Sequence, residues 1–298
     1  MRLLLVLVLT LLVPTASLGA ADQKAVLVTG ASTGIGRNVT ERLAAQGYLV
    51  YAGARKDADL KALGAIRNVQ PVKLDVTNTA DIDAALATIT KAGRGLHGLV
   101  NNAGVGTLGP LTSMAVEEFD LTMAVNVRGP FLVTRAFAPL IVAQKGRITT
   151  VGSISGILAG RGSGAYSMSK HAIEAFADSL AAEMEPQGVR VSVIEPGNYN
   201  SDIAKNAIGR LGGDAKLADR SRFKEPDEVA DAVMHALFDP NPKRRYMVVP
   251  DESEANVTIR RQVARVVELN EGQPYTFDRE ALGKMLDEAM ATARPRTK

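Results

Sequence analysis

The sequence of 298 residues contains no cysteine. Disulfide bonds, thiolate metal sites and cysteine nucleophiles are therefore excluded, although a chain without cysteine is compatible with either side of a membrane. Histidine is also scarce, because His97, His171 and His235 are the only three, lie far apart in the sequence and lack the spacing of metal ligands. We therefore expect no metal site.

Long runs of one charge are absent too, and the formal net charge is +3. The one local basic cluster, Lys243-Arg244-Arg245, is too short to indicate nucleic-acid binding and is better explained as a solvated turn. Hydrophobic residues make up 46% of the chain and charged residues 22%, which is typical of a globular protein. We therefore expect no nucleic-acid partner.

The N-terminal residues differ from the rest of the chain. Met1-Arg2 is a short basic start, Leu3 to Val13 is apolar apart from Thr10, and small residues follow as far as Ala21. This pattern is typical of a cleavable signal peptide, since a spanning helix needs about 20 apolar residues. If residues 1–21 stay uncut, they form a marginal anchor and the only membrane contact; a buried first strand or helix is the remaining alternative. We expect export (periplasm or secretory pathway) or membrane anchoring rather than a plain cytoplasmic location.

From Lys24 onward, short apolar runs alternate with longer amphipathic stretches. The runs are unbroken rather than alternating, which indicates strands covered on both faces. Strands are predicted at residues 25–29, 48–52, 69–73, 98–101, 147–151, 190–194 and 246–249. Helices are predicted at residues 38–46, 79–91, 116–144 (with a bend near Gly129), 166–184 and 226–238. The alternation predicts a doubly wound, Rossmann-type α/β fold with a mostly parallel seven-stranded sheet and helices on both faces.

The first predicted strand ends in TGASTGIG, residues 29–36, and runs directly into a helix. Glycines let the backbone turn sharply and approach a pyrophosphate, whose charge then lies at the N-terminus of the helix. The spacing departs from the standard Gly-x-Gly-x-x-Gly, and such a turn alone is weak evidence. Its position after the first strand favours a dinucleotide site. The predicted contacts are Gly30, Ser32, Thr33, Gly34, Ile35 and Gly36.

The end of the second predicted strand indicates which dinucleotide binds. An acidic residue there would bind the ribose of NAD, whereas an arginine would bind the 2′-phosphate of NADP. This chain has Arg55 there, and no carboxylate occurs from Val50 at the strand to Lys56, directly before Asp57. Because a guanidinium matches phosphate geometry in a bidentate way, NADP(H) is the preferred cofactor and NAD(H) remains possible. The alternative is that Arg55 and Lys56 are only a solvated strand end.

Seven short motifs follow one another along the chain. They are TGASTGIG, LDVT at 74–77, NNAG at 101–104, AVNVRGPF at 124–131, VGSISG at 151–156, YSMSK at 166–170 and EPG at 195–197. Any one of them is weak, but together they are specific. The chain resembles the short-chain dehydrogenase/reductase family over residues 24–250, and its pattern is most similar to the steroid and retinol dehydrogenase branch.

The resemblance implies a set of cofactor contacts beyond the glycine turn. Asp75, with Val76 beside it, is expected at the adenine, and Asn102, Ala103 and Gly104 along the cofactor. Pro196 and Gly197 are expected to close over the nicotinamide, and Ser201 stands where the family often has threonine. Residues 22–250 are therefore predicted to form one dinucleotide-binding catalytic domain. Residues 251–298 have a helical, charged pattern and are expected to pack on that domain or to trail it.

The resemblance also implies the catalytic residues. Asn126 would bend its helix and hold a water of the proton relay, and Ser153 would bind the substrate carbonyl oxygen. Tyr166 would be the general acid/base, while Lys170 would support it and bind the nicotinamide ribose, so both also contact the cofactor. Physical chemistry agrees, since a tyrosine with a pKa of about 10 needs a nearby cation to work near neutral pH. A lysine four residues further lies on the same helix face.

The sequence thus predicts an NAD(P)-dependent enzyme that moves a hydride between NADP(H) and a ketone or aldehyde and its alcohol. An apolar substrate such as a steroid or retinoid is expected, under a flexible lid formed by a loop and a helix in residues 198–223. That stretch mixes glycines and charges with Ile203, Ala207, Ile208, Leu211 and Leu217. The alternative is a non-catalytic NAD(P)-binding regulator or scaffold, which would be expected to lose the serine, tyrosine or lysine. The resemblance also implies a homodimer or homotetramer through the long helices after Val116 and Tyr166.

Overall fold

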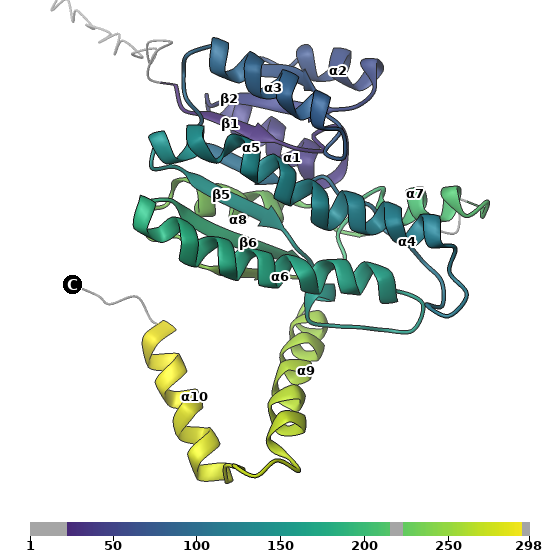
Figure 1. The fold of residues 1–298 in the computed structure, drawn as a ribbon, viewed down its shortest axis with the longest axis vertical. Coiled ribbons are helices and arrows are strands. Elements are labelled where there is room, and N and C mark those ends of the chain that lie inside the picture. Colours follow the sequence, from purple (N-terminus) through teal and green to yellow (C-terminus); the bar gives the residue numbers. More distant parts are fainter. Residues whose placement is uncertain (1–22, 215–222, 294–298) are drawn as a thin grey trace, which may run out of the picture.

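The computed structural model describes residues 23–214 and 223–293, and a parallel sheet lies at its centre (Figure 1). Its seven strands are β1 (Ala25–Val28), β2 (Leu49–Ala54), β3 (Val69–Lys73), β4 (Gly98–Asn101), β5 (Arg147–Val151), β6 (Arg190–Pro196) and β7 (Arg245–Val248). They lie in the order β3-β2-β1-β4-β5-β6-β7. The strand order reverses between β1 and β4, and ligands of such sheets bind beyond the carboxyl ends of the strands at that point.

Ten α-helices occur in the described part of the chain. They are α1 (Gly34–Ala45), α2 (Asp57–Gly64), α3 (Thr79–Lys91), α4 (Val116–Met123), α5 (Gly129–Ala143), α6 (Gly164–Met184), α7 (Ile203–Arg210), α8 (Asp227–Phe238), α9 (Glu252–Asn270) and α10 (Arg279–Ala293). The buried apolar clusters place α3, α5 and α6 on one face of the sheet and α1, α2 and α8 on the other. This arrangement confirms the predicted doubly wound α/β fold.

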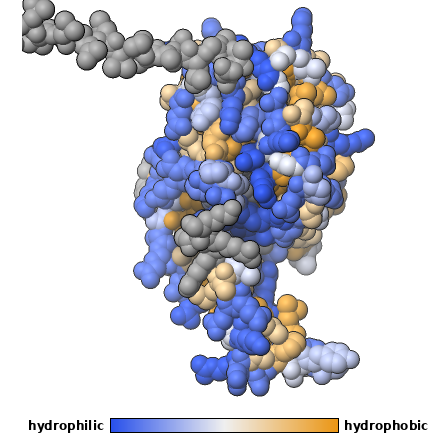
Figure 2. All heavy atoms as spheres, turned by 90° about the vertical axis from the view of Figure 1, so that its left-hand side faces the viewer, coloured by the Kyte–Doolittle hydropathy of each residue, from blue (hydrophilic) through white to orange (hydrophobic). Residues whose placement is uncertain are grey.

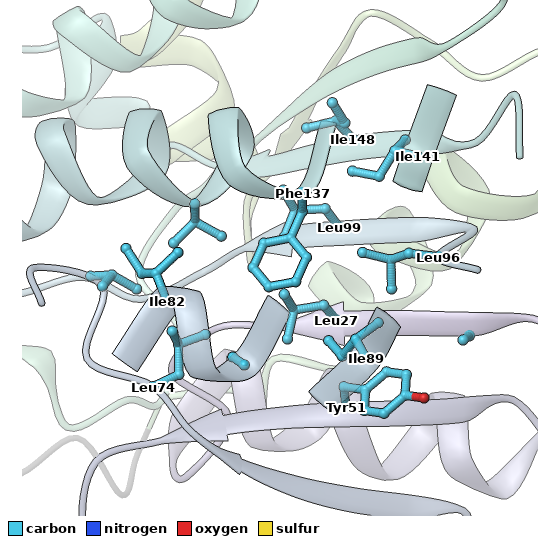
Figure 3. Close-up of a cluster of buried hydrophobic side chains, with 14 of the residues drawn as sticks. Leu27, Tyr51, Leu74, Ile82, Ile89, Leu96, Leu99, Phe137, Ile141 and Ile148 are labelled. Atoms are coloured by element: carbon cyan, nitrogen blue, oxygen red, sulfur yellow. The ribbon is translucent and has the colours of Figure 1, made fainter. Parts of the chain in front are cut away.

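The two faces are filled by alternate residues of each strand. In β1, Leu27 packs with the α3 and α5 layer while Val26 packs with the α1 and α8 layer, because successive side chains of a strand point to opposite faces. Figure 3 shows the first layer, in which Phe137 of α5 lies among Leu27 and Leu99. Burial of each such side chain stabilises the fold by roughly 1.5–3 kcal/mol. The apolar runs of the sequence are therefore buried as the strands at the centre of the fold.

The predicted helix at 116–144 is continuous but not uniform. Its middle, Ala124–Arg128, is a π-helical segment that joins α4 to α5. The irregularity therefore lies just before Gly129, where the bend was predicted. A π segment widens the helix by one residue per turn, and such segments occur frequently at functional sites.

One helix, α2, was not predicted from the sequence. It has only 8 residues, so its apolar periodicity repeats about twice and gives little signal. Helix α7 lies within residues 198–223, where a loop and a helix were predicted. The first helix also begins earlier than predicted, at Gly34, because the glycines of the preceding turn form its first residues. The strands agree with the prediction except at their ends.

The C-terminal helices α9 and α10 extend away from the sheet (Figure 1). Figure 2 shows apolar side chains on this lower lobe, where Val263, Leu269 and Leu286 are among the exposed residues. Among the helices that the structure describes, none combines the length and the apolar composition needed to cross a membrane. The predicted signal or anchor at 1–21 lies outside the described residues, so it stays a prediction.

Candidate active site

The glycine turn between β1 and α1 leaves no room for side chains at two positions. A Cβ atom on Gly36 would lie 2.2 Å from the carbonyl oxygen of Gly30 and 2.3 Å from Nδ2 of Asn102. Gly30 has φ +64, a left-handed conformation that glycine adopts without strain. The turn is therefore a bare backbone cradle at the N-terminus of α1, and α1 has no acidic residue in its first turn. Such a cradle fits a pyrophosphate.

The cradle is held by the residues that follow β4. Asn102 donates its Nδ2 hydrogens to the carbonyl oxygens of Thr29 at 2.9 Å and Gly30 at 3.0 Å. The hydroxyl of Thr29 in turn accepts the backbone N–H groups of Asn102 and Ala103, each at 3.0 Å. The structure thus places the predicted Asn102 and Ala103 against the glycine turn, while a Cβ on the predicted Gly104 would lie 3.5 Å from Asn126 Oδ1. Thr29 was not predicted as a site residue, although it is the first letter of the TGASTGIG motif.

The other predicted residues of the turn differ in exposure. Ser32 is half-buried and Thr33 is exposed directly before α1, where its side chain makes no capping hydrogen bond within the described residues. Gly34, with φ +54, comes within 3.4 Å of the Cβ of Ser201 when a Cβ is added to it. The side chain of Ile35 packs in the α1 and α8 layer instead. Ile35 can therefore contact a cofactor only through its backbone.

Arg55 and Asp75 lie side by side beyond the ends of β2 and β3. Arg55 Nη1 is 3.8 Å from Asp75 Oδ2, and the arginine side chain is 62% exposed. Asp75 accepts hydrogen bonds from the N–H of Thr77 at 2.9 Å and its hydroxyl at 2.7 Å. Burial raises the pKa of Asp75, but the bonds from Thr77 and the charge of Arg55 outweigh it and hold the pKa below its usual value. The structure thus has a carboxylate and a solvent-exposed guanidinium where the adenosine half of the cofactor is predicted to bind.

Val76 follows Asp75 but turns inward. It is 5% exposed, and a Cβ on Gly129 would lie 2.7 Å from its Cγ2. Its side chain therefore packs under the start of α5. Any contact of Val76 with a cofactor falls to its backbone.

Asn126 lies within the π-helical segment and is 2% exposed. Its side chain accepts the N–H of Val105 at 2.8 Å and donates to the carbonyl of Val105 at 2.9 Å and to Ser169 Oγ at 3.0 Å. Ser169 Oγ donates onward to the carbonyl of Tyr166 at 2.7 Å. Asn126 therefore joins the loop after β4 to the helix that carries Tyr166. Both hydrogens of its amide are engaged, and its role in holding a water stays a prediction.

Lys170 is buried behind Tyr166 on α6. Its Nζ lies 5.6 Å from the centroid of the Tyr166 ring and donates to the carbonyl of Val151, at the end of β5, at 2.9 Å. The lysine is 6% exposed, whereas Tyr166 is half-buried. Burial lowers the pKa of Lys170 to about 8, while the carboxylate of Glu174 opposes the shift. The amine therefore still carries a proton at neutral pH.

Ser153 lies two residues after Val151, in the loop that Lys170 contacts. It precedes a short 3-10 helix (Ile154–Gly156), and its Oγ accepts the N–H of Ser155 at 3.1 Å. The same oxygen donates to the carbonyl of Pro196, at the end of β6, at 3.4 Å. Ser153 is 8% exposed, and its hydroxyl is held between the 3-10 helix and the end of β6. The structure thus gathers Ser153, Tyr166, Lys170 and Pro196 at the carboxyl end of the sheet.

A pair of carboxyl groups under this loop, the buried Glu195 and the half-buried Glu174, was not predicted. Arg245 Nε lies 3.1 Å from Glu174 Oε2 and 3.3 Å from Glu195 Oε1. Burial, and then the nearby Glu174, raise the pKa of Glu195 to about 8. A Cβ at either Gly152 or Gly156 would come within 3.1 Å of Glu174 Oε1, so the glycines that flank Ser153 make room for this carboxylate. The sequence signal was an acidic residue within the apolar strand β6.

The stretch after β6 spans the site. Pro196 is the last residue of β6, and the N–H of Gly197 donates to the carbonyl of Val248 at 2.8 Å. Ser201 then reaches the glycine turn beside Gly34. The predicted residues Pro196, Gly197 and Ser201 therefore connect the Ser153 end of the site with the cradle. Of the lid predicted at 198–223, residues 215–222, including Leu217, lie outside the described residues.

Helix α7 closes one side of this stretch. Its Arg210 pairs with Glu118 of α4, with Nε 3.3 Å from Oε1, and also bonds the carbonyl of Gly106. A Cβ on Gly106 would lie 3.2 Å from Ile203 Cγ1. Among the predicted lid residues, Ala207 is buried, Ile203 and Ile208 are half-buried, and Leu211 is exposed. Within residues 23–214 and 223–293, no group of three or more His, Asp or Glu residues could hold a metal ion.

The chain is similar to known dehydrogenases in sequence. A family model described as short chain dehydrogenase matches residues 24–210. The chain is 31% identical over 264 residues to the mitochondrial D-beta-hydroxybutyrate dehydrogenase of Mus musculus, which covers 76% of this chain and 77% of that protein. It is 37% identical over 202 residues to retinol dehydrogenase 5 of Mus musculus, covering 66% of this chain and 63% of that protein.

Solved structures give the same result. A metagenomic short-chain oxidoreductase in complex with NADP is 31% identical, with a TM-score of 0.64 over 76% of this chain and 97% of that one. A short chain dehydrogenase/reductase of Burkholderia phymatum in complex with NAD has a TM-score of 0.73 over 86% of this chain and 99% of that one. At 24% identity, the second likeness concerns the fold alone.

Proposed function

The chain belongs to the short-chain dehydrogenase family and is a nicotinamide-dependent oxidoreductase acting on CH–OH groups; we propose that it interconverts an apolar ketone or aldehyde and its alcohol with NADP(H) as preferred cofactor. One observation carries the proposal. Tyr166 is half-buried at the carboxyl end of the sheet, and Lys170 Nζ lies 5.6 Å from its ring while bonded to the end of β5.

The chain's residues would handle the proton in carbonyl reduction. The bound nicotinamide would supply the hydride. The Tyr166 hydroxyl donates a proton to the carbonyl oxygen as the alcohol forms, and the buried Lys170 ammonium stabilises the phenolate that remains. Ser153 donates a hydrogen bond to the same oxygen, where negative charge develops. In alcohol oxidation the same groups act in reverse, with Tyr166 as the base.

The residues present fit a dinucleotide along one path. The glycine cradle and the N-terminus of α1 would hold the pyrophosphate, and Arg55 with Asp75 the adenosine half. Asn102, Ala103 and Gly104 would line the middle. Lys170 and the Pro196-Gly197 stretch would hold the nicotinamide end, with the Ser201 hydroxyl beside Gly34.

An apolar substrate is supported by the side chains near Tyr166. Leu111 is 55% exposed and lies over the first residue of α6, since a Cβ on Gly164 would be 2.6 Å from its Cδ1. Ile203 lies against Gly106, the residue after Val105. The backbone of Val105 is the group that Asn126 binds. The exposed Leu111 and the half-buried Ile203 favour a substrate with an apolar body. The name of one relative, retinol dehydrogenase 5, agrees with such a substrate.

Turnover is the experiment that tests this function. The purified protein should oxidise NADPH in the presence of at least one member of a panel of apolar ketones and aldehydes, followed by the loss of absorbance of the reduced nicotinamide. Cofactor binding without turnover on any panel member would favour the non-catalytic regulator instead. The oligomeric state and the destination of residues 1–21 stay predictions from the sequence.

The preference for NADP(H) predicts the effect of Arg55→Ala. The variant should raise the KM for NADPH by about 10-fold or more, because hydrogen bonds to charged groups contribute about 1.5–3 kcal/mol. The KM for NADH should hardly change, since Arg55 is 62% exposed and no 2′-phosphate is there to meet it. Steady-state kinetics with both cofactors measure the difference. Lys56→Ala is the matched control, and an equal rise for both cofactors with Arg55→Ala would contradict the role.

A further inference from the structure

Helix α9 lies beyond the region that the family model matches, yet its first turn contacts the stretch after β6. Glu254 Oε2 accepts the backbone N–H of Asn198 at 2.9 Å, and its Oε1 accepts the side-chain amide of Asn198 at 2.8 Å. A Cβ on Gly197 would lie 2.0 Å from Glu254 Oε2. The carboxylate therefore rests directly on the Gly197 backbone, and only glycine at 197 allows that approach.

The start of α9 is itself held in place. Asp251 caps the helix by accepting the N–H of Glu254 at 3.0 Å, and Lys224 Nζ bonds the carbonyl of Pro250 at 2.8 Å. Thr258, one turn after Glu254, is fully buried, and its hydroxyl donates to the carbonyl of Glu254 at 2.7 Å. Glu254 therefore projects from a rigid helix rather than from a loose tail, which is what a positioning side chain requires.

A second contact ties α9 to the helix of Tyr166. Arg265 Nη2 lies 2.9 Å from His171 Nε2, and His171 Nδ1 lies 2.8 Å from the carbonyl of Ser167. His171 is the residue next to Lys170 on α6. Figure 1 shows the start of α9 directly below α6. The helix thus bridges the two elements that carry the nicotinamide end of the site.

We propose that Glu254 is a positioning residue for the nicotinamide end of the cofactor, acting through the Gly197-Asn198 backbone that it binds. The proposal rests on the proposed function, which places the nicotinamide at Pro196-Gly197. A carboxylate that accepts two amide hydrogens forms charge-assisted bonds, which are stronger than neutral ones. The C-terminal extension therefore completes the cofactor site rather than trailing the domain.

The test separates the two halves of the cofactor. Glu254→Gln keeps the shape of the side chain but replaces one acceptor oxygen with an NH2 donor, so one of the two hydrogen bonds to Asn198 is lost and the other loses its charge. In calorimetric titrations of the full chain, the Kd for NADPH should rise about tenfold, as expected for bonds to a charged group. The Kd for adenosine 2′,5′-bisphosphate, which lacks the nicotinamide, should stay at its wild-type value. Glu252→Gln, on the exposed side of the same helix turn, is the matched control and should change neither Kd.

The outcomes are distinguishable. If the wild-type protein binds NADPH and Glu254→Gln binds it equally well, the positioning role is wrong. A parallel loss for NADPH and the bisphosphate would also overturn it, because that pattern indicates general damage to the fold. A wild-type protein that binds neither ligand would overturn the proposed function itself. If Glu254→Gln fails to fold in a thermal melt, Asn198→Ala removes the side-chain partner from the other end of the contact, and the same split in Kd values is required.

Discussion

Tyr166→Phe is expected to lower kcat for carbonyl reduction by about 10²–10⁴-fold, the usual contribution of a positioned general acid. The phenyl ring keeps the shape of the half-buried side chain above Lys170 and removes only the hydroxyl that donates the proton. The Kd for NADPH should therefore stay at its wild-type value. Stopped-flow single-turnover kinetics and a fluorescence titration measure the two quantities on the same preparation.

A control for this variant is available in the same chain. Tyr275 is 80% exposed between α9 and α10, so Tyr275→Phe removes a tyrosine hydroxyl without touching the sheet. It should leave both kcat and Kd unchanged. Unchanged turnover in Tyr166→Phe would remove Tyr166 from the mechanism, and a large rise in its Kd would show that the hydroxyl serves mainly in binding.

The centre of the sheet could be predicted because strands such as β1 and β4 are short and wholly buried. A run such as Ala25–Val28 has no polar face, so its apolar pattern and the turn after it both point to a strand. The glycine turn could be predicted for a physical reason as well, since Gly30 and Gly36 stand where any Cβ would collide with backbone or with Asn102. Local rules of this kind act within a few residues and are visible in a sequence.

The supporting residues of the site could not be predicted, because they depend on contacts between distant parts of the chain. Glu195 and Arg245 meet only when β6 and β7 pair, and Glu174 joins them from α6. In the sequence, nothing distinguishes Ser169 from other helix residues, because its bond to Asn126 forms only when α6 packs against the π-helical segment. Glu254 is one of many charged residues between 251 and 298, and only its close approach to Gly197 in the structure distinguishes it.

Lys170→Met is expected to have the second large effect on activity. An opposite charge nearby lowers a pKa by about 1–3 units, so loss of the ammonium should raise the apparent pKa of alcohol oxidation by that amount. The rate at neutral pH should then fall by about 10–1000-fold, since each unit is a tenfold change in the phenolate fraction. A pH–rate profile of kcat/KM measures both. Lys145→Met, on the loop before β5, is the control and should leave the profile unchanged.

The same variant should change how stability depends on pH. Burial lowers the pKa of Lys170 to about 8, from the 10.5 that an exposed lysine has in the unfolded chain. Between these values the unfolded chain binds more protons than the folded one, so the stability of the wild-type protein rises as the pH increases through that window. Below it, the folded protein bears the full cost of a buried ammonium.

Methionine fills the space of Lys170 without a charge, so the variant lacks this rise in stability. Its free energy of unfolding relative to the wild type should be most favourable below pH 8 and should decline toward pH 10.5. The lost bond to the Val151 carbonyl offsets part of the gain, by about 1 kcal/mol. Urea unfolding at several pH values measures this difference, and parallel curves for the two proteins would contradict it. A lysine that costs stability yet supports Tyr166 is what a site selected for chemistry rather than for stability would keep.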